Sequence, residues 1–430
     1  MKYNKIKKIF LNFFKKKQHK IFKSLSIINK DKSNLMFINS GINQFKNYFL
    51  KPKKIKFNKI ANIQKCIRIS GKISDLNKVG KDNYHHTMFE MLGNWSIGAY
   101  NIQKAIKYAW ILITKIYKIS KKRIFITVFK GDKNYKIKKD TLSYKCWKKL
   151  INKKRIFFFG KKKNFWKIDN FDLCGPCTEI YVDIRSKKEI KNKPIKNLIN
   201  KNQLIELWNI VNIKYLIKNK KIYKNKNYLS NNFIDTGMGF ERLCMILQKK
   251  KSTFDIDIFK LIIKKIESIF NIKYKKKVKH DVVIKIVADH IRSILIIIYY
   301  GILPNNTKYG YVLRKLIRRS LIYVYKYLNY KKPFLYKLVK ITYKTIFNKK
   351  DKKKIINIKN IIKKEEIFYF NNLKHNLVLM SKYLKKNKIK YIDKNLIFFI
   401  YSTFGINYFF IKKYAKKKNI KIFKNKIIEI

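Results

Sequence analysis

The chain has 430 residues, and 47% of them are hydrophobic, including 31 Phe and 29 Tyr. This length and composition suit two or three domains with real cores and exclude wholesale disorder. The formal net charge of +81 would usually indicate a nucleic-acid partner, since lysine near phosphates releases counterions. However, Lys, Ile, Asn, Tyr and Phe are inflated together, which is typical of a nucleotide bias towards A and T. Most of the charge is therefore expected to be solvated surface.

The five cysteines indicate a reducing compartment and not a disulfide framework. Cys174 and Cys177 have the CxxC spacing of a zinc or redox site, but no second CxxC and no HxxxH pair accompanies them. We therefore expect neither zinc nor another resident metal. No signal peptide is evident at the start, and no apolar run is long enough to span a membrane. These features predict a cytoplasmic protein without a membrane segment.

The first half of the chain mixes helical and extended patterns. Residues 102–116 have helical periodicity, whereas 124–129 and 180–183 are short β-rich runs. From Asp255 onward the pattern is mostly helical, with acids in the first turn of the first helix, as the helix dipole favours. The expected helices there cover 255–270, 282–300, 311–328, 335–347 and 356–383. The sequence predicts an α+β fold, with an α+β domain over residues 1–245 and a helical domain over residues 246–430.

Two stretches without lysine interrupt the basic chain, namely His85–Gly98 and Asp235–Arg242. Both combine glycine and glutamate with histidine or arginine in an otherwise apolar setting. A buried strand with satisfied polar groups would explain either stretch alone. Two such stretches in one chain favour a single shared active site.

Arginine is a second signal, because only nine of the 105 basic residues are arginine. Where lysine is the default, an arginine indicates a site that needs the planar fork of a guanidinium. Three of the nine lie within Arg314–Arg319, which weakens the alternative of chance survival.

The residues around these stretches suit a nucleotide. Arg68 precedes a turn at 70–72 that can bring backbone close to a phosphate. Phe89 offers an aromatic face, and His85 is expected on the same side of a strand because i and i+4 share a face. Arg242 ends a Gly-x-Gly-x-Glu-Arg run, in which small residues let a nucleotide approach and the guanidinium can grip phosphate. Together these residues would hold a bent nucleoside triphosphate.

The order of these motifs resembles the N-terminal, aminoacylating part of the alanyl-tRNA synthetases, a family of class II enzymes. The resemblance runs from about residue 19 to the C-terminus. It is carried by the segments 37–46, 64–68, 75–76, 85–96, 164–166, 174–180, 207–211, 235–242, 288–293 and 310–314. It implies an antiparallel class II sheet flanked by helices, followed by a mainly helical domain that recognises the acceptor stem of tRNA(Ala).

For ATP, the resemblance assigns roles to single positions. Arg68 and Arg242 would be catalytic, with Arg68 at the α-phosphate and Arg242 beside His85 at the outer phosphates. Phe89 would stack on adenine. The ATP-binding set implied is Arg68, Asp75, His85, Phe89, Glu90, Gly237, Gly239, Glu241 and Arg242. Mg²⁺ would enter as the cofactor that accompanies ATP.

For L-alanine, the resemblance implies that Asp235 pairs with the ammonium group. Trp166 and Val211 would wall a pocket sized for a methyl group, with ordinary core packing as the alternative for these two. Glycine would also fit such a pocket and lose only about 1–3 kcal/mol. The chain stops where the family's editing and oligomerisation parts begin, so we expect mischarging of glycine and serine, no editing site, and a monomer.

For tRNA, the resemblance implies contacts from Asn306, Arg314, Arg318, Arg319 and Ser402. Asn306 matches the position that reads the G·U pair of the acceptor stem. Ser402 stands where the family has an acid, so it could still hydrogen-bond a base edge but without a charge.

The chain departs from the family's pattern at further positions. Lys65 and Tyr84 stand where arginine is usual, and Ile69-Ser70 stands where Ala-Gly is usual. Residues 169–173 replace a Gly-Asp-Thr-Gly-Pro segment. These departures concern loop geometry more than the pocket itself.

Two other functions remain open from the sequence. A degenerate paralogue would bind tRNA without charging it, and a basic protein could bind nucleic acid without specificity. A pure binder need not keep an amino-acid pocket, whereas Arg68, Phe89, Trp166, Asp235 and Arg242 form a complete set. The lysine-free stretches disfavour the non-specific binder. The sequence therefore favours ATP-dependent attachment of L-alanine to tRNA(Ala) through an alanyl-adenylate.

Overall fold

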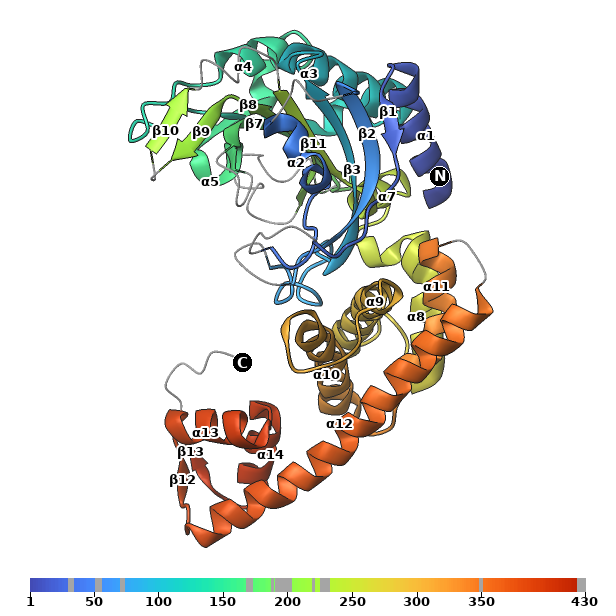
Figure 1. The fold of residues 1–430 in the computed structure, drawn as a ribbon, viewed down its shortest axis with the longest axis vertical. Helices are drawn as coiled ribbons and strands as arrows, with labels where there is room; N and C mark the ends of the chain where they lie inside the picture. Colours follow the sequence, from blue (N-terminus) through green and yellow to red (C-terminus); the bar gives the residue numbers. More distant parts are fainter. Residues whose placement is uncertain are drawn as a thin grey trace. The chain divides into compact units, whose positions relative to one another are not determined.

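The computed structural model describes residues 1–29, 35–50, 56–69, 74–167, 173–186, 189, 203–218, 221–224, 233–347 and 351–423. The chain forms two compact units, Met1–Ile262 and Ile263–Ile430 (Figure 1). The division falls inside helix α8 (Asp257–Phe270), later than the expected boundary after residue 245. The start of this helix packs on the first unit, since the ring of Phe259 stacks 4.9 Å from the ring of His86.

The first unit is built on a mixed sheet that has 11 strands within the described residues. The main path is β1 (Lys20–Phe22), β2 (Lys59–Ile67), β3 (Met88–Ile97), β11 (Phe233–Gly239), β8 (Leu204–Ile213), β7 (Leu173–Asp183), β4 (Ile124–Phe129) and β5 (Ile156–Phe159). β6 (Phe165–Lys167) and β9 (Tyr215–Lys218) pair with β7, and β10 (Lys221–Lys224) pairs with β9. The interior pairs are antiparallel, and the outermost pairs β1–β2 and β4–β5 are parallel. The predicted antiparallel sheet is confirmed.

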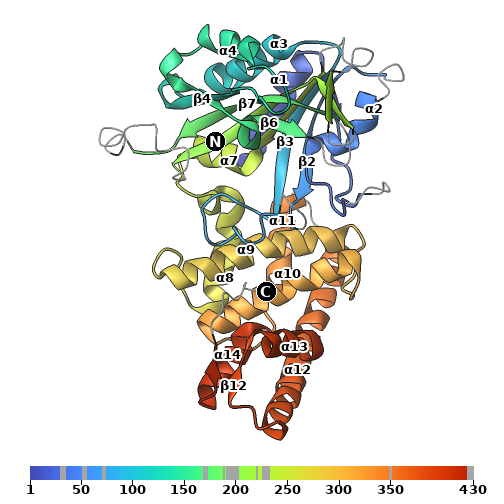
Figure 2. The ribbon, with the colours of Figure 1, turned by 90° about the vertical axis from the view of Figure 1, so that its left-hand side faces the viewer.

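Helices flank this sheet because each has one apolar face to bury. The helices of the unit are α1 (Tyr3–Lys16), α2 (Lys46–Leu50), α3 (Ile102–Trp110), α4 (Thr141–Lys148), α5 (Lys161–Asn164) and α7 (Phe240–Leu247). A π-helical segment, Ile111–Ile116, continues α3, so the helix expected over 102–116 is confirmed. In α1, Phe10 and Phe14 lie one turn apart and pack 6.4 and 6.5 Å from the ring of Trp208 on β8. Figure 2 shows α1, α3 and α4 on the same side of the sheet.

The second unit is mainly helical, as predicted. Its elements are the rest of α8, α9 (Val278–Tyr299), α10 (Lys308–Leu328), α11 (Val339–Phe347), α12 (Lys352–Lys386), α13 (Lys394–Phe404), α14 (Tyr408–Lys417) and the parallel pair β12 (Tyr391–Ile392) and β13 (Lys421–Ile422). A 3-10 turn, Leu335–Leu338, opens α11, and the buried Glu366 of α12 accepts the backbone N–H groups of Phe334, Leu335 and Tyr336 there. None of the helices in the described part of the chain is long and apolar enough to cross a membrane.

Candidate active site

One face of the sheet carries a cavity of about 840 Å³, part of which is open solvent. It is lined by Ser40, Arg68, Asp75, Tyr84, His85, His86, Phe89, Met91, Trp166, Glu206, Leu207, Asn209, Asp235, Gly237, Gly239, Glu241 and Arg242. Both lysine-free stretches contribute, because β11 lies between β3 and β8 and pairs with both. Every residue predicted to bind ATP or alanine lines this cavity except Glu90 and Val211.

The alternation of strand side chains decides which residues reach the cavity. On β3, Phe89 and Met91 line it, whereas Glu90 points to the opposite face and forms an ion pair with Lys7 of α1 at 2.5 Å. The carboxylate of Glu241 in turn accepts the backbone N–H of Glu90 at 3.1 Å. The structure therefore places the Glu90 side chain outside the cavity lining, contrary to its predicted position beside ATP.

Val211 is also absent from the cavity lining. It is fully buried in the core cluster that contains Trp95 and Phe233, and Trp166 packs against that cluster from the cavity side. Trp166 itself lines the cavity from β6, opposite Gly175 of β7. Trp166 therefore reaches the cavity, whereas Val211 lies in the core behind it.

Asp235 lies in the interior of the sheet, with 7% of its surface exposed. The one hydrogen bond of its side chain among the described residues comes from Trp95 Nε1, which donates to Oδ1 at 2.6 Å. Burial raises the pKa of Asp235 to about 7, against the lowering effect of the Trp95 hydrogen bond. A cation beside this carboxylate would restore its charge. The site therefore suits an ammonium group.

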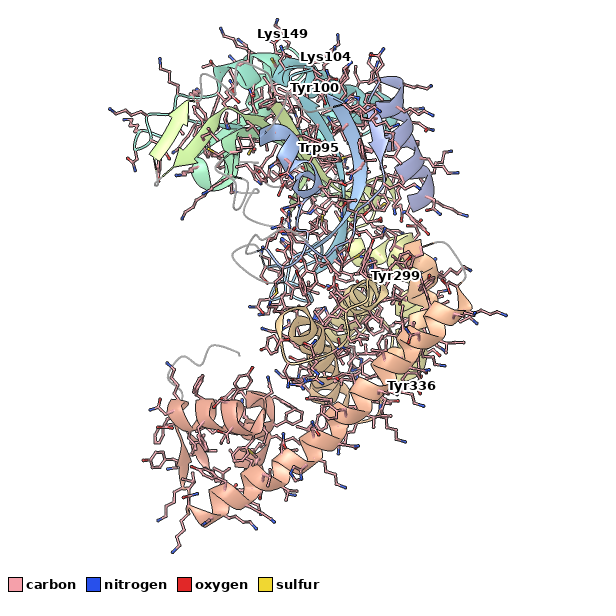
Figure 3. The ribbon with its side chains drawn as sticks, in the orientation of Figure 1. Trp95, Tyr100, Lys104, Lys149, Tyr299 and Tyr336 are labelled. Atoms are coloured by element: carbon pink, nitrogen blue, oxygen red, sulfur yellow. The ribbon has the colours of Figure 1, made fainter. Side chains whose placement is uncertain are left out.

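Trp95 can hold that carboxylate in place because the surrounding backbone confines the indole ring. The indole is fully buried in the first unit (Figure 3). A Cβ atom on Gly93 would lie 2.2 Å from the indole, and one on Gly41 would lie 2.7 Å from it. Both positions therefore require glycine, because the indole of Trp95 lies too close for a Cβ atom.

Arg68 and Phe89 form one wall of the cavity. The guanidinium of Arg68 lies 4.9 Å from the centroid of the Phe89 ring, and its Nε donates to the carbonyl oxygen of Asn39 at 3.1 Å. The carbonyl therefore orients the guanidinium, while its terminal nitrogens remain beside the cavity. One face of the Phe89 ring carries Arg68, so a base could stack on the other face.

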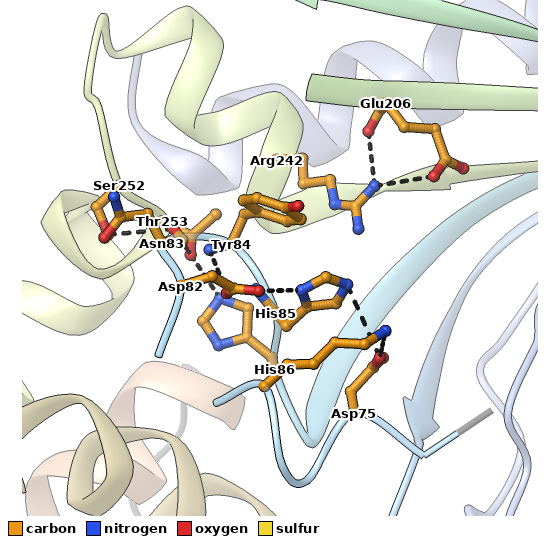
Figure 4. A network of polar contacts seen from close by, with 11 residues as sticks. Asp75, Asp82, Asn83, Tyr84, His85, His86, Glu206, Arg242, Ser252 and Thr253 are labelled. Carbon is orange, nitrogen blue, oxygen red and sulfur yellow. Dashed lines mark hydrogen bonds and ion pairs between the residues drawn. The ribbon is translucent and has the colours of Figure 1, made fainter. Parts of the chain in front are cut away.

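Arg242 forms the opposite wall and is held by two neighbours (Figure 4). Its Nη1 donates to the backbone carbonyl of Glu206 at 2.8 Å and to the Glu206 carboxylate at 3.3 Å. Its guanidinium also lies 5.1 Å from the centroid of the Tyr84 ring. A Cβ on Gly239 would lie 3.3 Å from Arg242 Cδ, so the glycine gives this side chain room.

His85 does not lie in a strand with Phe89, because β3 begins at Met88. It lies in the preceding turn, where Nδ1 is hydrogen-bonded to Asp82 and Nε2 lies 3.8 Å from Asp75 Oδ1 (Figure 4). Asp75 is also paired with Lys78 at 3.0 Å. His85 and Phe89 both line the cavity, but the strand periodicity that placed them on one face is wrong.

Several cavity residues were missed as individual predictions, namely Ser40, Tyr84, His86, Met91, Glu206, Leu207 and Asn209. The neighbouring side chains Glu206 and Leu207 both reach the cavity because the β7–β8 register shifts between Ile180 and Tyr181. No sequence pattern marked this bulge. Met91 could have been found by counting two residues on from Phe89. The turn at 70–72 and residues 169–172 lie outside the described residues.

The side chains that line the cavity fit Mg²⁺ better than zinc. No group of three or more His, Cys, Asp or Glu side chains in the described residues could hold a metal ion by itself. Cys174 and Cys177 are buried on β7 and form no disulfide among the described residues, and a Cβ on Gly175 between them would lie 1.9 Å from Asn212 O. Two residues with carboxylates, Glu206 and Glu241, are among those that line the cavity. Mg²⁺ typically takes one or two carboxylates together with substrate phosphates, and this donor set allows that.

The predicted tRNA-binding residues all belong to the second unit. Arg314 donates through Nη1 to Asn306 Oδ1 and forms an ion pair with Glu365 of α12 at 2.9 Å. Arg319 lies 4.9 Å from the ring of Tyr323. The hydroxyl of Ser402 is exposed and donates to the carbonyl of Phe398 on its own helix at 2.9 Å. Arg314 is thus committed to partners within the protein, which the sequence did not predict.

The chain matches the family described as class II (A) tRNA synthetases over residues 5–429. It is 43% identical over 407 residues to the alanine–tRNA ligase of Cytophaga hutchinsonii, and 42% identical over 412 residues to that of Christiangramia forsetii. These alignments cover 93% and 94% of this chain and 46% and 47% of the relatives, so the chain spans about half the length of the relatives it matches. Among solved structures, apo histidyl-tRNA synthetase of S. aureus aligns with 61% of this chain and 75% of its own at 12% identity and a TM-score of 0.33. On the sequence match, the chain belongs to the class II (A) tRNA synthetase family.

Proposed function

We propose that this chain activates L-alanine with ATP and transfers the alanyl group to tRNA(Ala). The observation that supports the proposal is the buried carboxylate of Asp235, of which Oδ1 accepts a hydrogen bond from Trp95. This carboxylate lies in a cavity that is also lined by Arg68, Phe89 and Arg242. A carboxylate of this kind selects a small cation, while arginines and an aromatic ring suit a nucleotide. One cavity therefore has complementary ends for an amino acid and for ATP.

At the amino-acid end, Asp235 would accept the ammonium group of alanine on its remaining oxygen. Trp166 would close the pocket over the methyl group. The Trp95 hydrogen bond keeps the Asp235 carboxylate aimed into the cavity before the substrate arrives. Such preorganisation avoids reorientation during the reaction.

At the nucleotide end, Arg68 would bind the α-phosphate and Phe89 would stack on adenine. An oxygen of the alanine carboxylate attacks the α-phosphorus, the bond to the bridging oxygen of pyrophosphate breaks, and alanyl-adenylate forms. Negative charge grows on the phosphate oxygens during this step, and the terminal nitrogens of Arg68 would stabilise it. Mg²⁺, held by Glu206 or Glu241 with the phosphates, would neutralise charge on the leaving pyrophosphate. In the second step, a 3′-terminal ribose hydroxyl of tRNA attacks the alanyl carbonyl and releases AMP.

We propose that residues 1–245 supply both chemical steps and that residues 246–430 bind the acceptor stem. The lysines and arginines of the helical unit suit a phosphate backbone. Asn306 and Ser402 are exposed polar residues there, which suits base contacts.

The test is alanine-dependent exchange of label between pyrophosphate and ATP, measured with the purified chain. Asp235→Asn should raise the KM for alanine by roughly 10²–10³-fold, since loss of one partner of a buried ion pair costs about 3–5 kcal/mol. The KM for ATP should change little. Asp132→Asn is the matched control, because Asp132 only receives the backbone N–H of Tyr135 in a turn away from the cavity lining.

Three outcomes separate the functions considered. Exchange with alanine supports the proposal. Binding of tRNA without any exchange would identify a degenerate paralogue. Equal losses for alanine and ATP in Asp235→Asn would mean that Asp235 serves the fold and not the substrate.

A further inference from the structure

The turn before β3 is built around one carboxylate, Asp82. Its Oδ1 accepts the backbone N–H of Tyr84 at 3.1 Å and that of His85 at 3.0 Å. Its Oδ2 forms a short hydrogen bond with His85 Nδ1. Asp82 therefore holds both the backbone and the ring of His85.

The contact with Nδ1 determines which ring nitrogen faces the cavity. Because Oδ2 is an acceptor, Nδ1 must carry its proton as donor. The ring is then fixed with Nε2 on the side of Asp75 and the cavity, and His85 is among the residues that line it (Figure 4). Burial raises the pKa of Asp82, but hydrogen bonds from the His85 side chain and from the backbone lower it more, so the net pKa lies below its ordinary value. The acceptor stays ionised at neutral pH.

The same turn is anchored from behind. The carbonyl oxygen of Asn83 accepts the backbone N–H of Thr253 at 2.8 Å and the hydroxyl of Ser252 at 3.1 Å. On its other side, the ring of Tyr84 lies 4.6 Å from the ring of His85. Because these contacts hold the turn in place, the Asp82 carboxylate can fix the orientation of the His85 ring.

We propose that Asp82 is a positioning residue that orients His85 Nε2 toward the outer phosphates of the bound nucleotide. Asp82 does not line the cavity, so its effect on the nucleotide must pass through His85. This inference rests on the proposed function. If it holds, the loss of Asp82 weakens nucleotide binding without altering the alanine end.

A double-mutant cycle tests this coupling. Asp82→Asn, His85→Gln and the double variant are compared with wild type in alanine-dependent ATP–pyrophosphate exchange. Asp82→Asn keeps an oxygen for the two backbone N–H groups but loses the charged acceptor, so the KM for ATP should rise roughly tenfold while the KM for alanine stays within about twofold. In the His85→Gln background, Asp82→Asn should add less than about twofold.

One control variant and two contrary results define the test. Asp132→Asn, which also loses a carboxylate that receives a backbone N–H in a turn, should behave as wild type. An Asp82→Asn effect that is equal for both substrates, or that persists undiminished without His85, would show that Asp82 only closes the turn. If Asp82→Asn does not fold, His85→Gln alone should still raise the KM for ATP and not that for alanine, and an unchanged KM for ATP overturns the inference.

Failure of the proposed function has a different signature. Wild-type protein would then show no alanine-dependent exchange, whatever the variants do. Equilibrium dialysis with labelled ATP on the same four proteins would still report the coupling. Non-additive loss of ATP affinity supports the inference, and additive loss overturns it.

Discussion

Arg68 and Arg242 of the first unit differ from Arg314 of the second unit in the partners that hold them. In the first unit, Arg68 donates through Nε to one carbonyl, and Arg242 donates through Nη1 to Glu206, so other donors of both forks remain beside a cavity. In the second unit, Arg314 is held by Glu365, by Asn306 and against the ring of Phe368. A guanidinium has five N–H donors in fixed directions, so contacts to some of them orient the group, and its position decides whether the remaining donors face a cavity or another part of the protein.

This comparison limits what arginine can indicate in a lysine-rich chain. Each arginine marks a place where a planar fork is needed. Whether the partner is a ligand or another side chain depends on residues far away in sequence, such as Glu365 for Arg314. Substitutions at Arg68, Arg314 and Arg318 can show which of these arginines contact a ligand and which contact only other side chains.

The largest effect is expected from Arg68→Ala. Removal of a preorganised donor from a developing charge typically costs about 10²–10³-fold in rate. Alanine-dependent exchange should fall by that amount while the thermal unfolding transition stays in place. Arg319→Ala in the second unit should leave exchange unchanged. An Arg68→Ala exchange rate within about threefold of wild type would refute the catalytic role.

The second effect concerns pH and Asp235. Burial raises the pKa of Asp235 to about 7, so below that pH the unliganded carboxyl is protonated and cannot pair with an ammonium group. The kcat/KM for alanine should therefore rise about tenfold per pH unit up to about pH 7 and then level off. The same slope should be absent for ATP.

The stability of the unliganded protein should depend on Asp235 with the opposite sign. The folded state binds this proton more tightly than the unfolded chain between pH 3.8 and about 7, so the Asp235 contribution to stability falls as pH rises through that window. Asp235→Asn should remove the pH dependence of kcat/KM for alanine and this contribution to the pH dependence of stability. A flat alanine profile in wild type would mean that another group binds the ammonium.

A third, smaller effect separates Arg314 from Arg318. Arg318 makes no hydrogen bond or ion pair within the described residues, so it is the better candidate for a phosphate contact. Arg318→Ala should reduce the slope of log tRNA affinity against log salt by about one. Arg314→Ala should weaken charging through the loss of its Asn306 contact and leave that slope unchanged. Both variants should activate alanine normally, and equal changes in slope would contradict the distinction.

The smallest effect is expected at Ser402. Its hydroxyl hydrogen is donated to Phe398 O, so the side chain can only accept from a base. An acid would accept more strongly, and Ser402→Asp should raise the preference for a G·U over a G·C minihelix roughly two- to tenfold. Charging of both minihelices by both proteins measures this. If neither protein discriminates, the helical unit recognises shape alone.

The fold could be predicted from the sequence where local periodicity determines it. The amphipathic pattern of 311–328 became α10, and the β-rich run 124–129 became β4. Local periodicity does not show where the first unit ends, since contacts such as that of Phe259 with His86 join residues far apart in sequence. The bulge in the β7–β8 pairing, which brings both Glu206 and Leu207 to the cavity, could not be predicted from the sequence either.

The candidate site was predicted largely from its residue types. Arg68, Phe89 and Arg242 line one cavity, as their chemistry suggested, and so does Asp235, which the family resemblance assigned. Glu90 does not line the cavity, because side chains on β3 alternate between the two faces of the sheet. The roles of the remaining residues stay predictions until substrates are tested.

The pairing of Trp95 with Gly41 and Gly93 sets a limit on how this sequence can drift. A mutational pressure towards lysine and asparagine can be accommodated at exposed positions, where a new side chain finds solvent. At either glycine, a single added carbon would collide with the indole ring, and displacement of that ring would release Asp235. A larger residue at either glycine would therefore require a compensating change at Trp95, so a drift towards lysine and asparagine is restricted at these three positions.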